Sequence, residues 1–154
     1  MKTVIISGIL IIAIFITALQ FIPLGIEPLT ELYFENHISL PAQIFSIKTY
    51  NFSFTIHNIE YQEMGYNYTI IAYDTNDTII KQISSQYTTI PDNQSTTILQ
   101  EYNLPKGFDR AKIQVVIYKD HLNITPEFKK KLWWPDPNYP EQVDIHFWVD
   151  ERTQ

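Results

Sequence analysis

The residues whose spacing most clearly suggests chemistry are asparagines followed two positions later by serine or threonine. Five of the nine asparagines have this spacing, which is the acceptor sequence for N-linked glycosylation at an archaeal or eukaryotic cell surface. Two sites fall on the polar phase of predicted strands and two in predicted turns, where they would reach solvent. The alternative interpretation is that asparagine and threonine are frequent because β surfaces are polar. The predicted sites are Asn51, Asn67, Asn76, Asn93 and Asn123.

Residues that commonly act in catalysis or bind metals form no recognisable constellation. The four histidines are scattered, without the paired spacing of a zinc site, and the aspartates lack the spacing of a calcium loop. Four glycines provide no phosphate-binding loop, and no serine lies in the sharp turn of a nucleophile. We therefore expect a protein that is not an enzyme and that binds no cofactor and no metal.

An aromatic cluster is the best candidate contact surface. Trp133, Trp134 and Tyr139 lie in a connection of about twenty residues between Asp120 and Gln142, and connections of that length are often functional. Exposed aromatic rings bury much area on binding, so these residues form a candidate binding loop. Two alternatives remain open: the rings cap an open end of the fold, or they rest at the membrane headgroups beside the preceding lysines.

The elements that position these groups begin with an apolar segment near the N-terminus. No charged residue occurs from Val4 to Ile26, and at about 1.5 Å per residue such a helix crosses a hydrocarbon core of roughly 30 Å. Lys2 precedes the segment and Glu27 follows it, so the positive-inside rule places the N-terminus in the cytoplasm. We predict a cytoplasmic start and transmembrane anchor helix in residues 1–26. The predicted localisation is the cell membrane, with a single pass and an extracytoplasmic C-terminal domain.

Two other interpretations of the apolar segment remain open. A cleaved secretory signal usually has a shorter apolar region and a small-x-small cleavage site, which Thr17 to Gln20 match poorly. A pilin-like leader cut after Gly8 would leave Ile9 to Phe21 as a filament-core helix. In that case the protein would be a pilin- or archaellin-like filament subunit.

Residues 27–154 suit one domain. The 154-residue chain is 45% hydrophobic and 14% aromatic, which is typical of a folded protein. With Lys2 set aside, the domain has 10 Lys and Arg against 17 Asp and Glu, a balance of about -7 that disfavours nucleic acid and anionic lipid as partners. The absence of cysteine leaves its stability to core packing.

Alternation with a period of two residues predicts that this domain is all-β. Tyr50, Phe52, Phe54 and Ile56 alternate with polar residues, and similar patterns recur along the chain with turn residues between them. About seven strands result, which fits an immunoglobulin-like antiparallel β-sandwich preceded by one transmembrane helix. The predicted strands are 32–36, 50–57, 66–72, 79–84, 94–102, 111–118 and 143–149.

Several strand motifs resemble one known family. They are Leu29–Phe34 with Leu40-Pro41, Tyr50–Glu60, Leu104-Pro105, Lys112–Lys119 and Ile145–Val149. With these motifs the chain resembles the archaeal membrane proteins that carry a DUF1616-type extracytoplasmic domain. The resemblance implies an immunoglobulin-like module beside a membrane and brings no catalytic residues. Many members have several membrane helices, whereas this chain has one predicted helix.

Together these observations predict a cell-surface binding protein without enzymatic activity. A single-pass anchor would display a glycosylated immunoglobulin-like domain to another envelope component, through the tryptophan loop or an exposed sheet edge. The alternatives are the filament subunit described above and an accessory subunit of a membrane protein complex.

Overall fold

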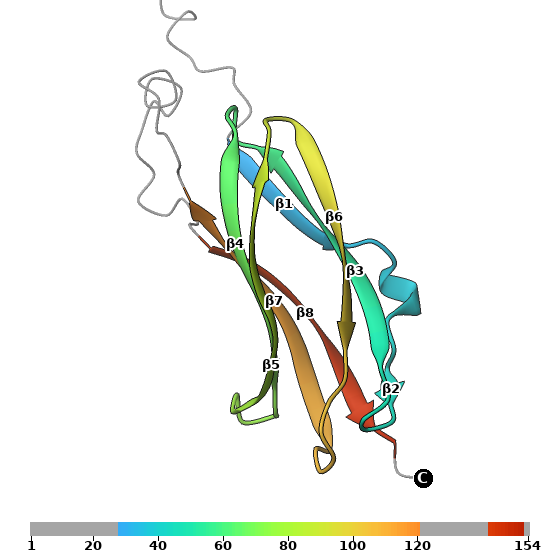
Figure 1. The fold of residues 1–154 in the computed structure, drawn as a ribbon. Helices are drawn as coiled ribbons and strands as arrows, with labels where there is room; N and C mark the ends of the chain where they lie inside the picture. Colours follow the sequence, from blue (N-terminus) through green and yellow to red (C-terminus); the bar gives the residue numbers. More distant parts are fainter. Residues whose placement is uncertain (1–27, 121–141, 153–154) are drawn as a thin grey trace, which may run out of the picture.

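A computed structural model describes residues 28–120 and 142–152, and this part of the chain is all β apart from one short turn of 3-10 helix (Figure 1). The predicted anchor helix in residues 1–26 and the aromatic loop lie outside the described residues. Within the described ranges, no helix has the length and apolar character needed to cross a membrane. The elements are β1 (Leu29–Phe34), η1 (His37–Ser39), β2 (Gln43–Ile44), β3 (Tyr50–Ile59), β4 (Met64–Tyr73), β5 (Ile79–Ile90), β6 (Gln94–Tyr102), β7 (Arg110–Asp120) and β8 (Gln142–Glu151).

Two sheets face each other in a sandwich. The three-stranded sheet has the order β1-β3-β6, and the five-stranded sheet has the order β2-β8-β7-β4-β5. All neighbouring strands are antiparallel except β2 and β8, which pair in parallel over two residues. The predicted count of about seven is correct for the long strands. The two-residue β2 was missed, because it is too short to show any periodicity.

The alternating apolar residues of the sequence face inward and form the core. Phe52, Phe54 and Ile56 in β3 are buried, as are the matching positions of β4 and β7. Because alternate side chains of a strand point to opposite faces, one buried face per strand produces this pattern. On the C-terminal strand, Phe147 contacts the rings of Phe34 and Phe52, with centroid distances of 5.4 and 5.2 Å. Edge-to-face aromatic pairs therefore join the two sheets.

Most strand boundaries differ from the prediction by one or two residues, and two differ by three or more. The first strand begins at Leu29 rather than Leu32, because its backbone pairs with the end of β3. β5 continues from Ser84 to Ile90, because it pairs with β4 as far as Met64. In both cases pairing with a neighbour extends a strand beyond the clear alternation.

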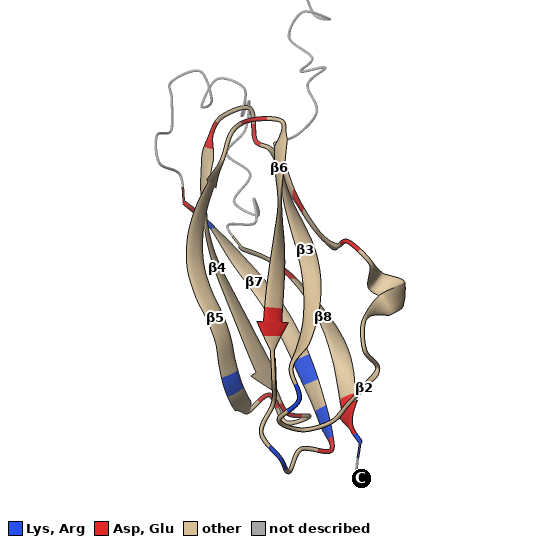
Figure 2. Cartoon of the chain, turned by 45° about the vertical axis from the view of Figure 1, so that its right-hand side comes forward, with Lys and Arg blue, Asp and Glu red and all other residues tan. Residues whose placement is uncertain are grey.

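The two ends of the sandwich differ in what they contain. We call the end where β1 and β8 begin and β7 ends the proximal end, and the opposite end the distal end (Figure 1). Figure 2 shows that Lys and Arg residues gather toward the distal end. Among the described Lys and Arg residues the exception is Lys119, near the proximal end of β7.

Candidate functional site

One side of the sandwich has open strand edges in both sheets. β1 is the outer strand of the three-stranded sheet and pairs only with β3. In the other sheet, β2 covers the outer edge of β8 only at Asp150 and Glu151. Within the described residues, no strand pairs with the outer edge of β8 from Gln142 to Val149. Unpaired backbone groups of this kind can accept an additional strand from another chain.

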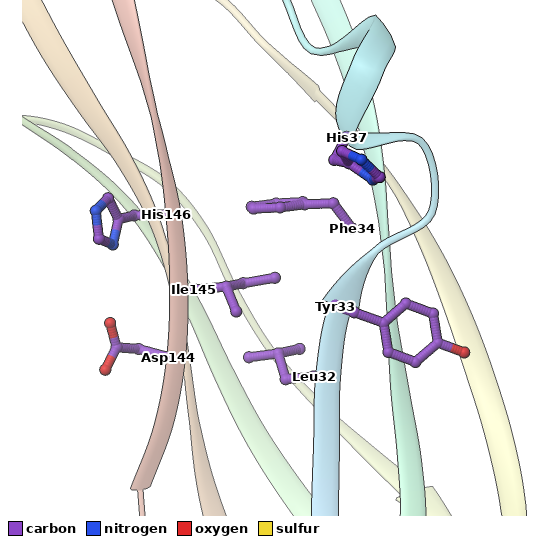
Figure 3. Close-up of a pocket in the computed structure, with 7 residues that line it drawn as sticks. All are labelled: Leu32, Tyr33, Phe34, His37, Asp144, Ile145 and His146. Atoms are coloured by element: carbon purple, nitrogen blue, oxygen red, sulfur yellow. The ribbon is translucent and has the colours of Figure 1, made fainter.

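A groove lies between these two edges and has an apolar floor. In Figure 3, Leu32 and Phe34 of β1 point toward Ile145 of β8. These three side chains are partly buried and pack against the core. Phe34 is held by edge-to-face contacts with two core rings. The groove has a volume of about 490 Å³ and is lined by Leu32, Tyr33, Phe34, His37, Asp144, Ile145 and His146.

The polar residues around the groove give its rim an acidic character. Asp144 accepts a hydrogen bond of 2.8 Å from Gln114, and Glu31 on the outer face of β1 lies 3.0 Å from His57. Glu35, just beyond β1, accepts a hydrogen bond from Thr55. None of the seven lining residues is a lysine or an arginine. The groove therefore favours an occupant that is apolar where it meets the floor and basic at its margins.

The histidines and carboxylates near the groove do not converge on one point. His146 and Asp144 point away from the floor on the far side of β8, whereas His37 lies beyond Phe34 (Figure 3). In the described part of the chain, no group of three or more histidines and carboxylates could hold a metal ion. The residues that line the groove therefore offer a surface for contact.

The structure places four of the five predicted glycosylation sites, and all four asparagines are exposed. Asn51 lies in β3 on the outer face of the three-stranded sheet, and Asn67 lies in β4 on the outer face of the five-stranded sheet. Asn76 and Asn93 lie in the turns before β5 and β6. These four sites occupy neither β1 nor β8. Asn123 lies outside the described residues.

Local hydrogen bonds explain the two turn sites. The carboxylate of Asp74 accepts hydrogen bonds of 2.8 Å from the backbone N–H groups of Asn76 and Thr78, which closes the hairpin between β4 and β5. Asn93 has a φ of 57°, a left-handed conformation that asparagine adopts more readily than most residues. Both turns keep the asparagine side chain at the surface.

Trp133, Trp134 and Tyr139 all lie outside the described residues, so their role as a contact surface or as a cap stays a prediction. The segment that contains them connects β7 with β8 and leaves and rejoins the sandwich at the proximal end.

A buried ion pair lies at the proximal end. Lys119 Nζ lies 2.7 Å from Glu60 Oε1, and the two side chains are 1% and 0% exposed. The Thr30 hydroxyl donates to the same oxygen over 2.6 Å and lies 3.1 Å from the Tyr66 hydroxyl. Burial raises the pKa of Tyr66. These residues come from β1, β4, β7 and the turn after β3, so the cluster joins the two sheets.

Sequence reasoning missed this ion pair, although one signal was present. Lys119 continues the inward phase of Ile113, Val115 and Ile117, which places its side chain inside the sandwich. An inward lysine requires a buried partner of opposite charge. No pattern in the sequence pointed to that partner, because Glu60 lies in a turn and is far from Lys119 along the chain.

Comparisons with known proteins identify the fold. No protein-family model matches the chain, and no curated protein matches it in sequence. One similar solved structure is a chain of the complex between zinc 2-glycoprotein and prolactin inducible protein from human seminal plasma, with a TM-score of 0.54 and 9% identity. The match covers 80% of this chain and 94% of that chain.

Two further similar structures are parts of larger proteins. Escherichia coli alpha-2-macroglobulin has a TM-score of 0.50 and 14% identity, with 83% of this chain matching 10% of that chain. A mutant beta-glucosidase from Listeria innocua, in complex with laminaribiose, has a TM-score of 0.51 and 12% identity. There, 82% of this chain matches 16% of that chain. At these identities the likeness shows the fold alone, and it confirms the predicted immunoglobulin-like β-sandwich.

Proposed function

We propose that this protein is a non-enzymatic cell-surface module anchored in the membrane by a single N-terminal helix. Residues 1–26 hold the chain in the bilayer with the N-terminus in the cytoplasm. The immunoglobulin-like domain of residues 27–154 carries N-linked sugars and binds another component of the cell envelope. We also propose that the chain is related to the DUF1616-type membrane proteins, which its strand motifs resemble.

The observation that carries the binding proposal is the groove between the open edges of β1 and β8. Its backbone groups are available to pair with a strand, and its floor of Leu32, Phe34 and Ile145 offers apolar contacts. The four described glycosylation sites lie elsewhere, so attached sugars would leave this side clear. Among the described residues, the groove therefore offers a surface suited to protein contact.

The proposed occupant is an extended segment of an envelope protein. Its alternate side chains would be apolar, to meet the groove floor, and the residues between them would include Lys or Arg, to meet Asp144 and Glu35. A second copy of this chain suits the groove less well, because the chain has a formal net charge of -6 and would bring acidic residues against an acidic rim.

Site-specific photo-cross-linking in the native membrane tests this proposal. The variant Tyr33→benzoylphenylalanine places a photoreactive ring on β1 at the margin of the groove, pointing away from the floor (Figure 3). Leu99→benzoylphenylalanine places the same ring on β6, across the same sheet. We expect a cross-link from position 33, but not from position 99, to one partner segment with alternating apolar and basic residues. Mass spectrometry of the cross-linked peptides identifies that segment.

Other outcomes of this experiment assign the groove differently. A cross-link from position 33 to a second copy, or to residues 121–141 of the same chain, would contradict the proposed occupant. Equal cross-linking from positions 33 and 99 would mean that the groove is not selective. The charge variant Asp144→Lys should abolish the cross-link, whereas Asp92→Lys, with the same charge change in the turn before β6, should retain it.

Intact mass and N-terminal sequencing of the protein from its native membrane test the anchor. A full-length chain with sugar increments supports the proposal. A chain that begins at Ile9 would support the filament subunit instead, and a later start without sugars would indicate a released secreted domain. Co-purification with a larger membrane protein in mild detergent would favour the accessory subunit.

A further inference from the structure

Asn67 differs from the other glycosylation sites in its neighbours. It lies in β4, between β7 and β5, and its strand partners are Tyr118 on one side and Tyr87 on the other. All three residues are exposed on the outer face of the five-stranded sheet, where the two tyrosines are 49% and 46% exposed. Directly opposed residues on one face have Cβ atoms about 5 Å apart. In the pairing register, Asn67 therefore lies between two tyrosines.

The position of the Tyr87 ring depends on a glycine. A Cβ atom at Gly65 would collide with the hydroxyl and ring carbons of Tyr87, so this ring lies across the backbone at Gly65. Gly65 is buried for the same reason, although it faces outward like Asn67. The absence of a side chain lets the ring lie close to the sheet beside Asn67. Such a ring presents a broad apolar surface to solvent.

Tyr118 extends this apolar surface on the other side of Asn67. The neighbouring outward residue of β7, Val116, lies opposite Thr69 of the glycosylation sequence and is 7% exposed. The asparagine thus projects from the sheet between two partly exposed tyrosines and beside a buried valine. A sugar ring has one face made of C–H groups, which packs on an aromatic ring as an apolar surface does.

We propose that the sugar attached to Asn67 packs against Tyr118 and Tyr87 and is a structural part of the domain. This inference rests on the proposed function, which assigns the domain to a glycosylating cell surface. The transfer joins the amide nitrogen of Asn67 to the first carbon of the sugar. It breaks the bond of that carbon to a lipid-linked phosphate donor and releases an amide proton.

Asn51 provides a matched control. It is also exposed in a strand and also belongs to an Asn-x-Ser/Thr sequence, but its partner in β6 is Glu101. β1 pairs with β3 only from Phe54 onward, so no residue of β1 lies opposite Asn51. A sugar at Asn51 therefore has no opposing aromatic ring and should extend into solvent.

The test compares the thermal stability of glycosylated full-length variants in detergent. We expect Asn67→Gln to lower the Tm by roughly 2–5 °C relative to the unaltered protein, because it removes a contact like that of an aromatic pair. In a Tyr118→Thr background the same substitution should lower the Tm by only about half as much, because the contact with Tyr87 remains. Asn51→Gln should leave the Tm nearly unchanged. Peptide mass spectrometry records the occupancy of each site.

Each outcome separates this inference from the proposed function. If Asn67 carries a sugar and Asn67→Gln lowers the Tm equally in both backgrounds, the sugar does not pack on Tyr118 and the inference is wrong. If Asn67 is empty while other sites carry sugars, the inference is wrong but the glycosylated module stands. If no site carries a sugar, both the inference and the proposed glycosylation are wrong.

Discussion

Removing the positive charge of the buried ion pair should strongly destabilise the domain. Lys119→Met leaves the Glu60 carboxylate fully buried, with the Thr30 hydroxyl as a donor at 2.6 Å and without the ammonium group at 2.7 Å. Leaving one charge of a buried pair without its partner costs about 3–5 kcal/mol. Because a domain is stabilised by about 5–15 kcal/mol in total, this is a large part of its free energy of unfolding.

The surface ion pair between Lys112 and Asp77 is the matched control. Its N–O distance of 2.6 Å is as short, but the two side chains are 18% and 75% exposed. Solvent screens such a pair, so Lys112→Met should cost only about 0–1 kcal/mol. The two lysines are on the same strand and undergo the same substitution. The difference between the two variants therefore measures the effect of burial.

Urea unfolding of the full chain in detergent, followed by near-ultraviolet circular dichroism, measures these costs. With a slope of about 2 kcal/mol per molar urea, Lys119→Met should lower the unfolding midpoint by roughly 2 M. The double variant Glu60→Leu with Lys119→Met should be more stable than either single variant, since no unpaired charge remains. Equal losses for Lys119→Met and Lys112→Met would refute the reasoning. The reasoning would also be refuted if the double variant lost as much free energy of unfolding as the two single variants together.

Three further predictions concern buried polar side chains. Burial raises the pKa of Tyr66 and Tyr102 in the folded state, so the stability they contribute is complete below the unfolded pKa of about 10. That stability should be lost as the pH rises above about 10. In urea unfolding from pH 8 to 11, the double variant Tyr66→Phe with Tyr102→Phe should lose less of its free energy of unfolding than the unaltered protein. An equal loss in the two proteins would contradict this prediction. At pH 7, Tyr102→Phe should be neutral or stabilising, because the buried hydroxyl has no hydrogen-bond partner among residues 28–120 and 142–152. Tyr66→Phe should cost about 1 kcal/mol by removing a contact with Thr30. Equal unfolding midpoints for the two variants would argue against this difference. Asn58→Ala should lower the free energy of unfolding by about 2–3 kcal/mol. The buried side-chain amide donates hydrogen bonds to two backbone carbonyls and accepts one from a backbone N–H. A shift of the unfolding midpoint below about 0.5 M urea would contradict this prediction.

The residues facing the core were predictable from the sequence because strand periodicity is a local property. Phe52, Phe54 and Ile56 are buried as predicted. Ile113 and Val115 are also buried, and they alternate in the same way with Lys112 and Gln114. Each of these positions depends on the alternation of side chains within its own strand. For the same reason, the outward phase of Asn51 and Asn67 could be inferred without knowing which strands pair.

The groove and the aromatic neighbours of Asn67 were not predictable, because they depend on strand order and register. Leu32 and Ile145 meet because β1 and β8 are open edges on the same side of two sheets. Tyr87 and Tyr118 lie beside Asn67 because each strand pairs with β4 in one particular register. A slip of one residue would turn their side chains to the other face.

The sequence by itself determined that this domain is a β-sandwich with a defined set of inward residues. It did so because apolar and polar residues alternate with a period of two, interrupted by turn residues. Each strand therefore has one apolar face, which is stable only when it is buried. The tertiary structure alone decided which edges stay open, that Lys119 meets Glu60, and which rings flank Asn67. Those contacts join residues far apart along the chain, and they form only when both sheets have assembled.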